Sequence, residues 1–218
     1  MALPPSLSEQ PSMLVVDASV IISLNATGCA EAILGALPHR VAVVDIVVNE
    51  IRGGLRRGRL DAAKLDALIE ANLLHVVELG PIGLSRFESL VVGDAGETLD
   101  DGEAATLAYA EEASARAVID ERKARRLAGE RHAAIPLSCT IDLLACDSVG
   151  SVLGPTGIAD AIHSALVGAR MRVLNEHMDW VVNLIGDERA AGCPSLSAFV
   201  REQARTRLQR TSVEHEPS

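Results

Sequence analysis

The sequence predicts a three-layer α/β domain with a central parallel sheet, followed by C-terminal helices. Three observations support this prediction. Short apolar runs alternate with helical stretches through the first two thirds of the 218-residue chain. Strand-like runs disappear after residue 141, where only helical spacing continues. Hydrophobic residues make up 48% of the chain, which is enough for a core without disulfides. Strands that alternate with helices are typical of parallel strands joined by crossovers.

Five short runs, rich in valine, alanine and other apolar residues, are expected to form the sheet. Such runs are typical of strands that are buried on both faces. Asp17 directly follows the first run, and Asp120 directly follows the fourth. The predicted strands are residues 13–16, 41–44, 75–77, 117–119 and 133–137.

Helices are expected between these strands and throughout the C-terminal third. Residues 60–73 are a clear case, because their leucine and isoleucine side chains recur at helical intervals of three and four. The predicted helices are residues 19–24, 30–37, 46–51, 60–73, 84–92, 101–113, 121–131, 141–148, 157–170, 173–185 and 195–209.

This layout predicts the following organisation. We expect a disordered leader over residues 1–12, the α/β domain over 13–150, a helical extension packed on it over 151–210, and a frayed tail over 211–218. The leader lacks the basic start and apolar core of a signal peptide. No apolar run approaches the roughly 20 residues of a membrane span, so we expect a cytoplasmic protein. The four cysteines form no C-x-x-C pair and are expected to be small buried hydrophobes.

The overall charge and composition limit the classes of function. A net charge of -10 and a pI near 5.0 count against nucleic-acid binding, unless basic residues cluster locally. Aromatic residues are only 2% of the chain, which argues against recognition of bases by stacking.

Acidic residues occur where strands end or helices begin. Asp17 and Asp120 each follow a predicted strand, and ligands of open parallel sheets bind beyond the carboxyl ends of the strands. Glu50 lies in the helix after the second strand, and Glu103 in the first turn of the helix before the fourth. Clustered carboxylates repel unless a cation compensates, and such oxygen ligands suit Mg²⁺ or Mn²⁺. The alternative is that the aspartates only cap helices and Glu50 is a solvated helix residue.

Four segments together resemble the PIN-domain family. The first two are similar to the opening of PIN domains and to a second block in which a glutamate closes a V-x-x-E element. The last two resemble a branch related to VapC-type toxins of toxin–antitoxin systems. The segments read LVVDASVIISLNATG, VAVVDIVVNEIRGG, LDDGEAATLAYA and AVIDERKARRLAGE, and the resemblance covers about residues 13–150.

The resemblance implies a catalytic set of Asp17, Glu50, Glu103 and Asp120. It places Asp17, Glu103 and Asp120 on a metal, with Asp101 as a competing candidate for the third position. It further implies a Mg²⁺- or Mn²⁺-dependent endoribonuclease with an RNA substrate. Relatives are commonly homodimers and are often inhibited by a small antitoxin protein. Ser19 matches the small hydroxyl residue that accompanies the first aspartate, and we expect it to contribute to substrate binding.

The chain departs from this branch after the fifth predicted strand. Relatives tend to show T-G-T followed by glycine, whereas this chain reads Ser138-Cys-Thr-Ile-Asp142. Asp142 is either an additional acidic group near the site or a helix residue without a role in it. His163 and His177 lie in helical patterns and are expected to be structural, and Met171, Val173 and Leu174 are spaced for helix packing.

Basic residues cluster directly after Asp120. They are candidates for gripping the phosphates that flank the cleaved bond. The alternative is that they form ion pairs with glutamates on helix surfaces. The cluster consists of Arg122, Lys123, Arg125 and Arg126.

Three hypotheses of function follow. The first is a metal-dependent endoribonuclease that acts as the toxin of a toxin–antitoxin pair. The second is a housekeeping RNA-processing nuclease with the same catalytic site. The third is a catalytically silent PIN fold that serves as a binding module, which the intact set of four acidic residues disfavours.

Overall fold

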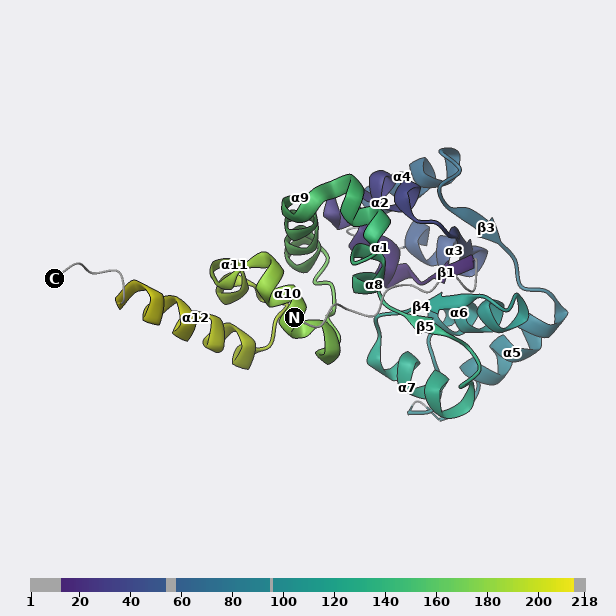
Figure 1. Cartoon of the computed structure of the whole chain (residues 1–218). Coiled ribbons are helices and arrows are strands. Elements are labelled where there is room, and N and C mark those ends of the chain that lie inside the picture. The colour runs from purple at the N-terminus through teal and green to yellow at the C-terminus, as the bar shows by residue number, and fades with distance from the viewer. Residues whose placement is uncertain (1–12, 54–57, 95, 214–218) are drawn as a thin grey trace.

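The fold is known from a computed structural model that describes residues 13–53, 58–94 and 96–213 (Figure 1). The predicted leader at residues 1–12 and residues 214–218 of the predicted tail lie outside the described residues. Residues 211–213, which were assigned to the tail, instead continue the last helix.

A five-stranded, fully parallel sheet forms the centre of the domain, as the sequence predicted. The strand order is β3-β2-β1-β4-β5. From β1 the chain proceeds outward to β2 and β3 on one side, then returns to β4 and β5 on the other. The boundary between β1 and β4 is therefore the point where the strand order reverses, which is where open α/β sheets bind ligands. The strands are β1 (Met13–Val16), β2 (Arg40–Val44), β3 (His75–Val77), β4 (Arg116–Val118) and β5 (Leu137–Ser138).

Helices connect the strands and make up the whole C-terminal third. They are α1 (Ala18–Thr27), α2 (Ala30–Ala36), α3 (Asp45–Gly53), α4 (Gly58–Glu70), α5 (Pro81–Val91), α6 (Asp101–Glu112), α7 (Arg122–Arg131), α8 (Thr140–Leu144), α9 (Asp147–Gly168), the 3-10 helix η1 (Asn175–His177), α10 (Met178–Ile185), α11 (Asp187–Gly192) and α12 (Ala198–Val213).

The helices form layers on both sides of the sheet (Figure 1). Right-handed crossovers place the β1–β2 and β2–β3 helices on one face and the β3–β4 and β4–β5 helices on the other. On the first face α1 packs against α2, α4 and α9. On the second, α6 lies against β1, β2 and β4 and is flanked by α5 and α7. The structure is thus a three-layer α/β domain with C-terminal helices.

The core is built almost entirely from aliphatic side chains. Leu14, Val15 and Val16 of β1 are 0% exposed, as expected for a central strand covered on both faces. Helix α6 is buried on nearly every side, and its alanines allow close approach to the sheet. The first turn of α6, which carries Glu103, is consequently held rigidly against the ends of the strands.

Several elements of the structure differ from the prediction. The fifth strand was expected at 133–137 but comprises Leu137–Ser138, because residues 133–135 form a turn and Pro136 has no N–H to donate. Residues 173–174, predicted as the start of a helix, precede η1 without helical structure, although Met171, Val173 and Leu174 are buried as expected. A short helix, α11, was not predicted, and α9 begins earlier than expected, with a break at Gly154 (φ 67°) before Pro155.

The C-terminal helices extend away from the sheet. Figure 1 shows α10 and α11 beyond α9, with α12 leading to the far C-terminus. Helix α10 contacts α9, and α12 contacts α11. No single helix in the described ranges has the length and apolar character needed to cross a membrane. The α1–α2 pair reaches that size only when counted together, and the two helices are bent by 113°.

Candidate active site

Asp17 lies at the junction of β1 and α1, beside the end of β4. Its backbone N–H donates to Val118 O at 3.3 Å, which joins the ends of the two strands. Its side chain caps α1 and accepts hydrogen bonds from the Ser19 backbone N–H at 3.3 Å and from Ser19 Oγ at 2.8 Å. Only 5% of Asp17 is exposed. The local sequence therefore fixes this carboxylate through the helix cap, and Ser19 orients it.

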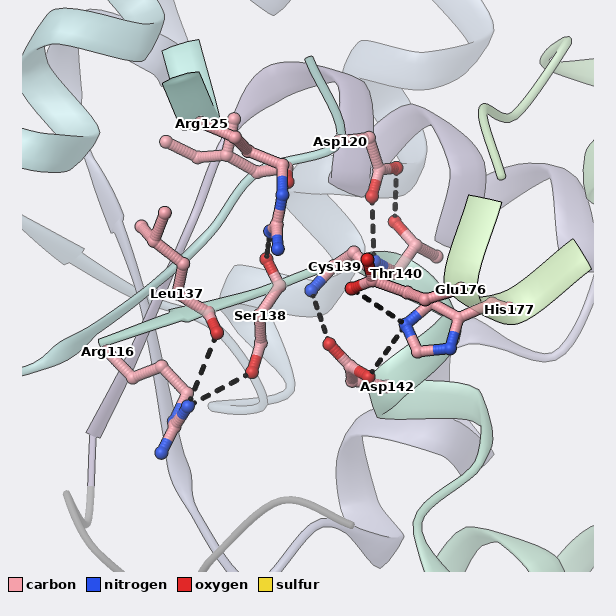
Figure 2. A network of polar contacts seen from close by, with 11 residues as sticks. Arg116, Asp120, Arg125, Leu137, Ser138, Cys139, Thr140, Asp142, Glu176 and His177 are labelled. Carbon is pink, nitrogen blue, oxygen red and sulfur yellow. Dashed lines mark hydrogen bonds and ion pairs between the residues drawn. The ribbon is translucent and has the colours of Figure 1, made fainter. Parts of the chain in front are cut away.

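Asp120 lies two residues beyond β4, the strand next to β1 in the sheet. Its two carboxylate oxygens accept hydrogen bonds from Thr140, one from the backbone N–H at 2.8 Å and one from Oγ1 at 2.7 Å (Figure 2). Thr140 is the first residue of α8, so the start of that helix holds the carboxylate in place. Thr140 was not among the predicted site residues, because its bond to Asp120 spans a sequence separation of 20 residues.

Glu103 and Glu50 complete the group from two helices. Asp100 caps α6 by accepting a hydrogen bond from the Glu103 N–H at 2.9 Å, which fixes the turn that carries Glu103. The neighbouring Gly102 lies against two of the carboxylates. A Cβ added at Gly102 would overlap Glu50 Oε2 and lie 3.4 Å from Asp17 Oδ1. Asp17 and Glu50, which are distant in the sequence, therefore meet at one glycine.

The four carboxylates share an electrostatic environment that disfavours their charged forms. Burial is the main cause and raises the pKa of Asp17, that of Asp120 to about 6, and those of Glu50 and Glu103 to about 7. The negative charge of Asp17 adds to the rise at the other three residues. Hydrogen bonds from Thr140 and the charge of Arg125 partly oppose the rise at Asp120.

Within the described residues this charge is compensated only in part, by Arg125 at Asp120. None of the four carboxylates forms an ion pair with an arginine, lysine or histidine of that part of the chain. Converging carboxylates whose pKa values rise in this way are stabilised by a bound cation. Because all the donors are hard oxygens, the group fits Mg²⁺ or Mn²⁺.

The third acidic position is better filled by Glu103 than by Asp101. The pKa of Glu103 responds to Asp17, and Glu103 is only 7% exposed. Asp101 is exposed and affects only Glu50. Asp100 was not predicted as a site residue, although its charge raises the pKa of Asp17, Glu50 and Glu103. Its position in an N-cap pattern, three residues before a glutamate, was the available sequence signal.

The predicted basic cluster is divided by the structure. Arg125 is turned inward, where its guanidinium donates to Ile119 O at 3.1 Å and Ser138 O at 2.8 Å (Figure 2). Arg126 forms an exposed ion pair with Glu130 at 2.8 Å. Both interactions favour a structural role for these two arginines over a contact with phosphate.

The other two residues of the basic cluster, Arg122 and Lys123, also lie on α7. Arg122 is exposed and donates to Asn175 Oδ1 at 3.2 Å, which connects α7 with η1. Lys123 is half-buried.

Asp142 belongs to a second polar cluster, adjacent to the first. It is buried in α8 and accepts a hydrogen bond from the Cys139 N–H at 2.8 Å. Its Oδ1 lies 3.2 Å from Nε2 of the buried His177 (Figure 2). Burial alone would raise the pKa of Asp142, but His177 and the Cys139 amide outweigh it, so that this pKa is lowered.

The comparisons with known proteins agree with this architecture. The family model described as "DUF3368: PIN domain" matches residues 13–145, more than half of the 218-residue chain. The matched region contains all five strands and the four acidic residues. No curated protein and no solved structure matches the chain.

Proposed function

Because this chain belongs to the PIN-domain family, whose members are generally nucleases, we propose that it is a divalent-metal-dependent endoribonuclease that hydrolyses RNA phosphodiester bonds. One observation carries the proposal. Four acidic side chains, from the residue after β1, from α3, from α6 and from the loop after β4, converge where the strand order reverses, with raised pKa values and no ion pair among the described residues.

In this proposal Asp17, Glu103 and Asp120 hold the metal, and Glu50 lies at the solvent side of the group. A bound Mg²⁺ or Mn²⁺ would orient the phosphodiester, lower the pKa of a coordinated water and stabilise the leaving oxygen. Ser19 and Thr140 orient the carboxylates of Asp17 and Asp120.

Glu50 is the only exposed member of the group, and its pKa is about 7. It is therefore suited to accept and release a proton near neutral pH. Gly102 leaves the space that the Glu50 and Asp17 carboxylates need.

We propose fewer basic residues for substrate binding than the sequence suggested. Arg122, exposed on the first turn of α7, is the best placed of the basic residues to contact a phosphate that flanks the cleaved bond. Arg125 instead supports the loop that carries Asp120, because its guanidinium bonds to Ile119 O and Ser138 O.

We further propose that the protein acts as the toxin of a toxin–antitoxin pair, as a homodimer with a small antitoxin partner. Support comes from the G-E-A and I-D-E-R-K-A-R-R segments, which resemble the branch related to VapC-type toxins. A housekeeping nuclease would have the same catalytic site. Expression of the protein alone should arrest growth if it is a toxin, and co-expression of a small reading frame from its genetic neighbourhood should restore it. Unimpaired growth with an active nuclease would favour the housekeeping role.

Calorimetric titration with Mn²⁺ tests the metal site. Wild type should bind, and the Asp17→Asn/Asp120→Asn double variant should not. Asp160→Asn is the matched control, because Asp160 pairs with Arg189 on an exposed helix surface. Absence of binding by folded wild type, or unchanged binding by the double variant, would refute the assignment and favour a silent PIN fold.

A further inference from the structure

Three chemically different side chains meet behind the acidic group. They are Cys139 and Asp142, at the start of α8, and His177, at the end of η1. All three are buried, and one potential ligand atom of each lies within 4.8 Å of the other two. His177 lies outside the region that matches the family, whereas Cys139 and Asp142 lie inside it and replace the glycine-containing pattern of the resembled branch. The cluster therefore joins the α/β domain to the C-terminal helices.

The histidine in this cluster lacks the hydrogen bonds that a buried imidazole normally makes. His177 is 1% exposed, yet neither Nδ1 nor Nε2 has a hydrogen-bond partner among the described residues. Asp142 Oδ1 also has no hydrogen-bond partner among the described residues, although it lies 3.2 Å from His177 Nε2. Buried polar atoms are nearly always bonded, so such a group requires a specific explanation.

Two carboxylates approach the same imidazole nitrogen. Asp142 Oδ1 lies 3.2 Å from His177 Nε2, and Glu176 Oε1 lies 3.9 Å from it. Glu176 is mostly exposed, whereas His177 is buried. A thiol, an imidazole and one carboxylate thus lie within 4.8 Å of one another, and a second carboxylate lies 3.9 Å from the imidazole.

This donor set differs in kind from the all-oxygen group of the active site. Sulfur and imidazole nitrogen favour a borderline cation such as Zn²⁺ over Mg²⁺. Zn²⁺ binds sulfur at about 2.3 Å and nitrogen or oxygen at about 2.0–2.2 Å, which places tetrahedral ligand atoms about 3.4–3.8 Å apart. The side chains, already within 4.8 Å, require only small rotations to reach that spacing.

We propose that Cys139, Asp142 and His177 form a structural zinc site, with Glu176 or a water as the fourth ligand. On binding, Cys139 Sγ forms the Zn–S bond and loses its proton to solvent, while His177 offers its neutral Nε2. The site fixes the start of α8, where the next residue, Thr140, holds Asp120. It also ties η1 to the α/β domain.

Cobalt substitution tests the proposal, because Co²⁺ bound to a thiolate gives a characteristic near-ultraviolet charge-transfer absorption. Added to the metal-free full chain, Co²⁺ should produce this band at one equivalent, and excess Zn²⁺ should abolish it. Cys139→Ser should remove the band. Cys29→Ser is the matched control, since Cys29 is a partly buried free cysteine at the start of α2 and outside the cluster.

A thermal measurement supplements the spectrum. Zn²⁺ at a hundredfold excess over its dissociation constant should raise the Tm of wild type by roughly 5–10 °C and that of Cys139→Ser by much less. The Asp17→Asn/Asp120→Asn variant should keep both the band and the shift, because it retains Cys139, Asp142, His177 and Glu176. Failure of the nuclease proposal is thereby distinguishable from failure of this one.

Two outcomes would overturn the inference. One is wild type that shows neither a thiolate band nor a zinc-dependent Tm shift, a result that requires no variant to fold. The other is a band that persists in Cys139→Ser. Either result would reduce the cluster to a buried contact between Asp142 and His177 without a role in metal binding.

Discussion

Two polar clusters lie side by side at the start of α8, and an aspartate behaves oppositely in each. Asp120 accepts two hydrogen bonds from Thr140, yet burial raises its pKa to about 6. Asp142 is also buried and also accepts a backbone hydrogen bond, yet its pKa is lowered. The neighbours of the two carboxylates differ. The charge of Asp17 adds to the rise at Asp120 and that of Arg125 opposes it, whereas His177 makes the largest contribution to lowering the pKa of Asp142.

The comparison shows that hydrogen bonds alone do not compensate a buried charge. The charge of Asp17 adds to the rise in pKa at Asp120, Glu50 and Glu103, and a cation from solution would balance this group. The cluster around Asp142 contains an imidazole and a thiol in addition to oxygen. It can therefore balance its charge internally, or take a cation of a different type. The two sites should respond differently to each of the following changes.

The largest effect is expected from removal of a carboxylate that holds the catalytic metal. Asp17→Asn and Asp120→Asn should each lower RNA cleavage by more than roughly a hundredfold, since loss of even an outer partner of a metal ligand costs about 10- to 100-fold. Cleavage of labelled RNA under single-turnover conditions measures this. Circular dichroism should show an intact fold. Near-normal cleavage by either variant would remove that residue from the site.

A positioning role of Thr140 can be separated from a purely structural one. Thr140→Val should lower cleavage by about 10- to 100-fold and weaken Mn²⁺ binding, because Asp120 loses a hydrogen bond that orients it. Thr140→Ser keeps the hydroxyl and should restore most of both. Equal defects in the two variants would point to packing rather than to the hydroxyl.

In the second cluster, formed by Cys139, Asp142 and His177, removal of the histidine should reduce the stability of the fold the most. In chelator-treated protein, His177→Ala leaves Asp142 as a buried charge without its partner, which should destabilise the fold by about 3–5 kcal/mol. Urea unfolding measures the loss. Arg189→Ala is the exposed counterpart, because it breaks the surface pair with Asp160 and should cost less than about 1 kcal/mol. Similar losses in both variants would contradict a special role for the buried pair.

The pH dependence of stability should differ between the clusters. The pKa of Glu103 in the folded chain is about 7, above its ordinary 4.5, so the fold favours its protonated form. The corresponding stability is complete at low pH and is lost as the pH rises through about 7. Glu103→Gln should therefore reduce the loss of stability of the metal-free protein above about pH 5, by on the order of 2–3 kcal/mol.

The contribution of Asp142 to stability should depend on pH in the opposite direction. Its pKa is lowered, so its contribution is present above its ordinary 3.8 and is lost as the pH falls further. Asp142→Asn should remove a loss of stability in acid, whereas Glu103→Gln acts near neutral pH. Denaturant unfolding across the pH range distinguishes the two. If both variants altered the same pH window, the contrast between the clusters would be wrong.

The sequence was sufficient for the features that depend on local pattern. Apolar runs predicted four of the five strands closely, and the aspartates that follow β1 and β4 lie together as expected because those strands are neighbours. The fifth strand was misplaced because only two residues pair, and no two-residue strand has a recognisable hydrophobic pattern. A helix was predicted only from residue 157, whereas α9 begins at Asp147 and is interrupted at Gly154, before Pro155.

Features that depend on contacts between distant residues were not predictable in this way. Thr140 reaches Asp120, and His177 reaches Asp142, only because β5 and η1 are folded against the end of β4 and the start of α8. For Arg125, the sequence suggested a role that its contacts in the structure do not favour. Its place in a basic run suggested a phosphate contact, but its guanidinium is bound to Ile119 O and Ser138 O.

The smallest expected effect separates Arg122 from Arg125. Arg122 is exposed, so Arg122→Ala should weaken RNA binding uniformly across sequences and reduce the slope of log K against log salt by about 1. Arg125→Ala removes a charged donor from two backbone carbonyls, so it should lower stability by about 1.5–3 kcal/mol and leave the salt slope unchanged. Binding measured with a metal-site variant, which does not cleave the RNA, keeps the substrate intact. A smaller slope for Arg125→Ala than for Arg122→Ala would reverse the assignment and return Arg125 to the RNA-binding surface.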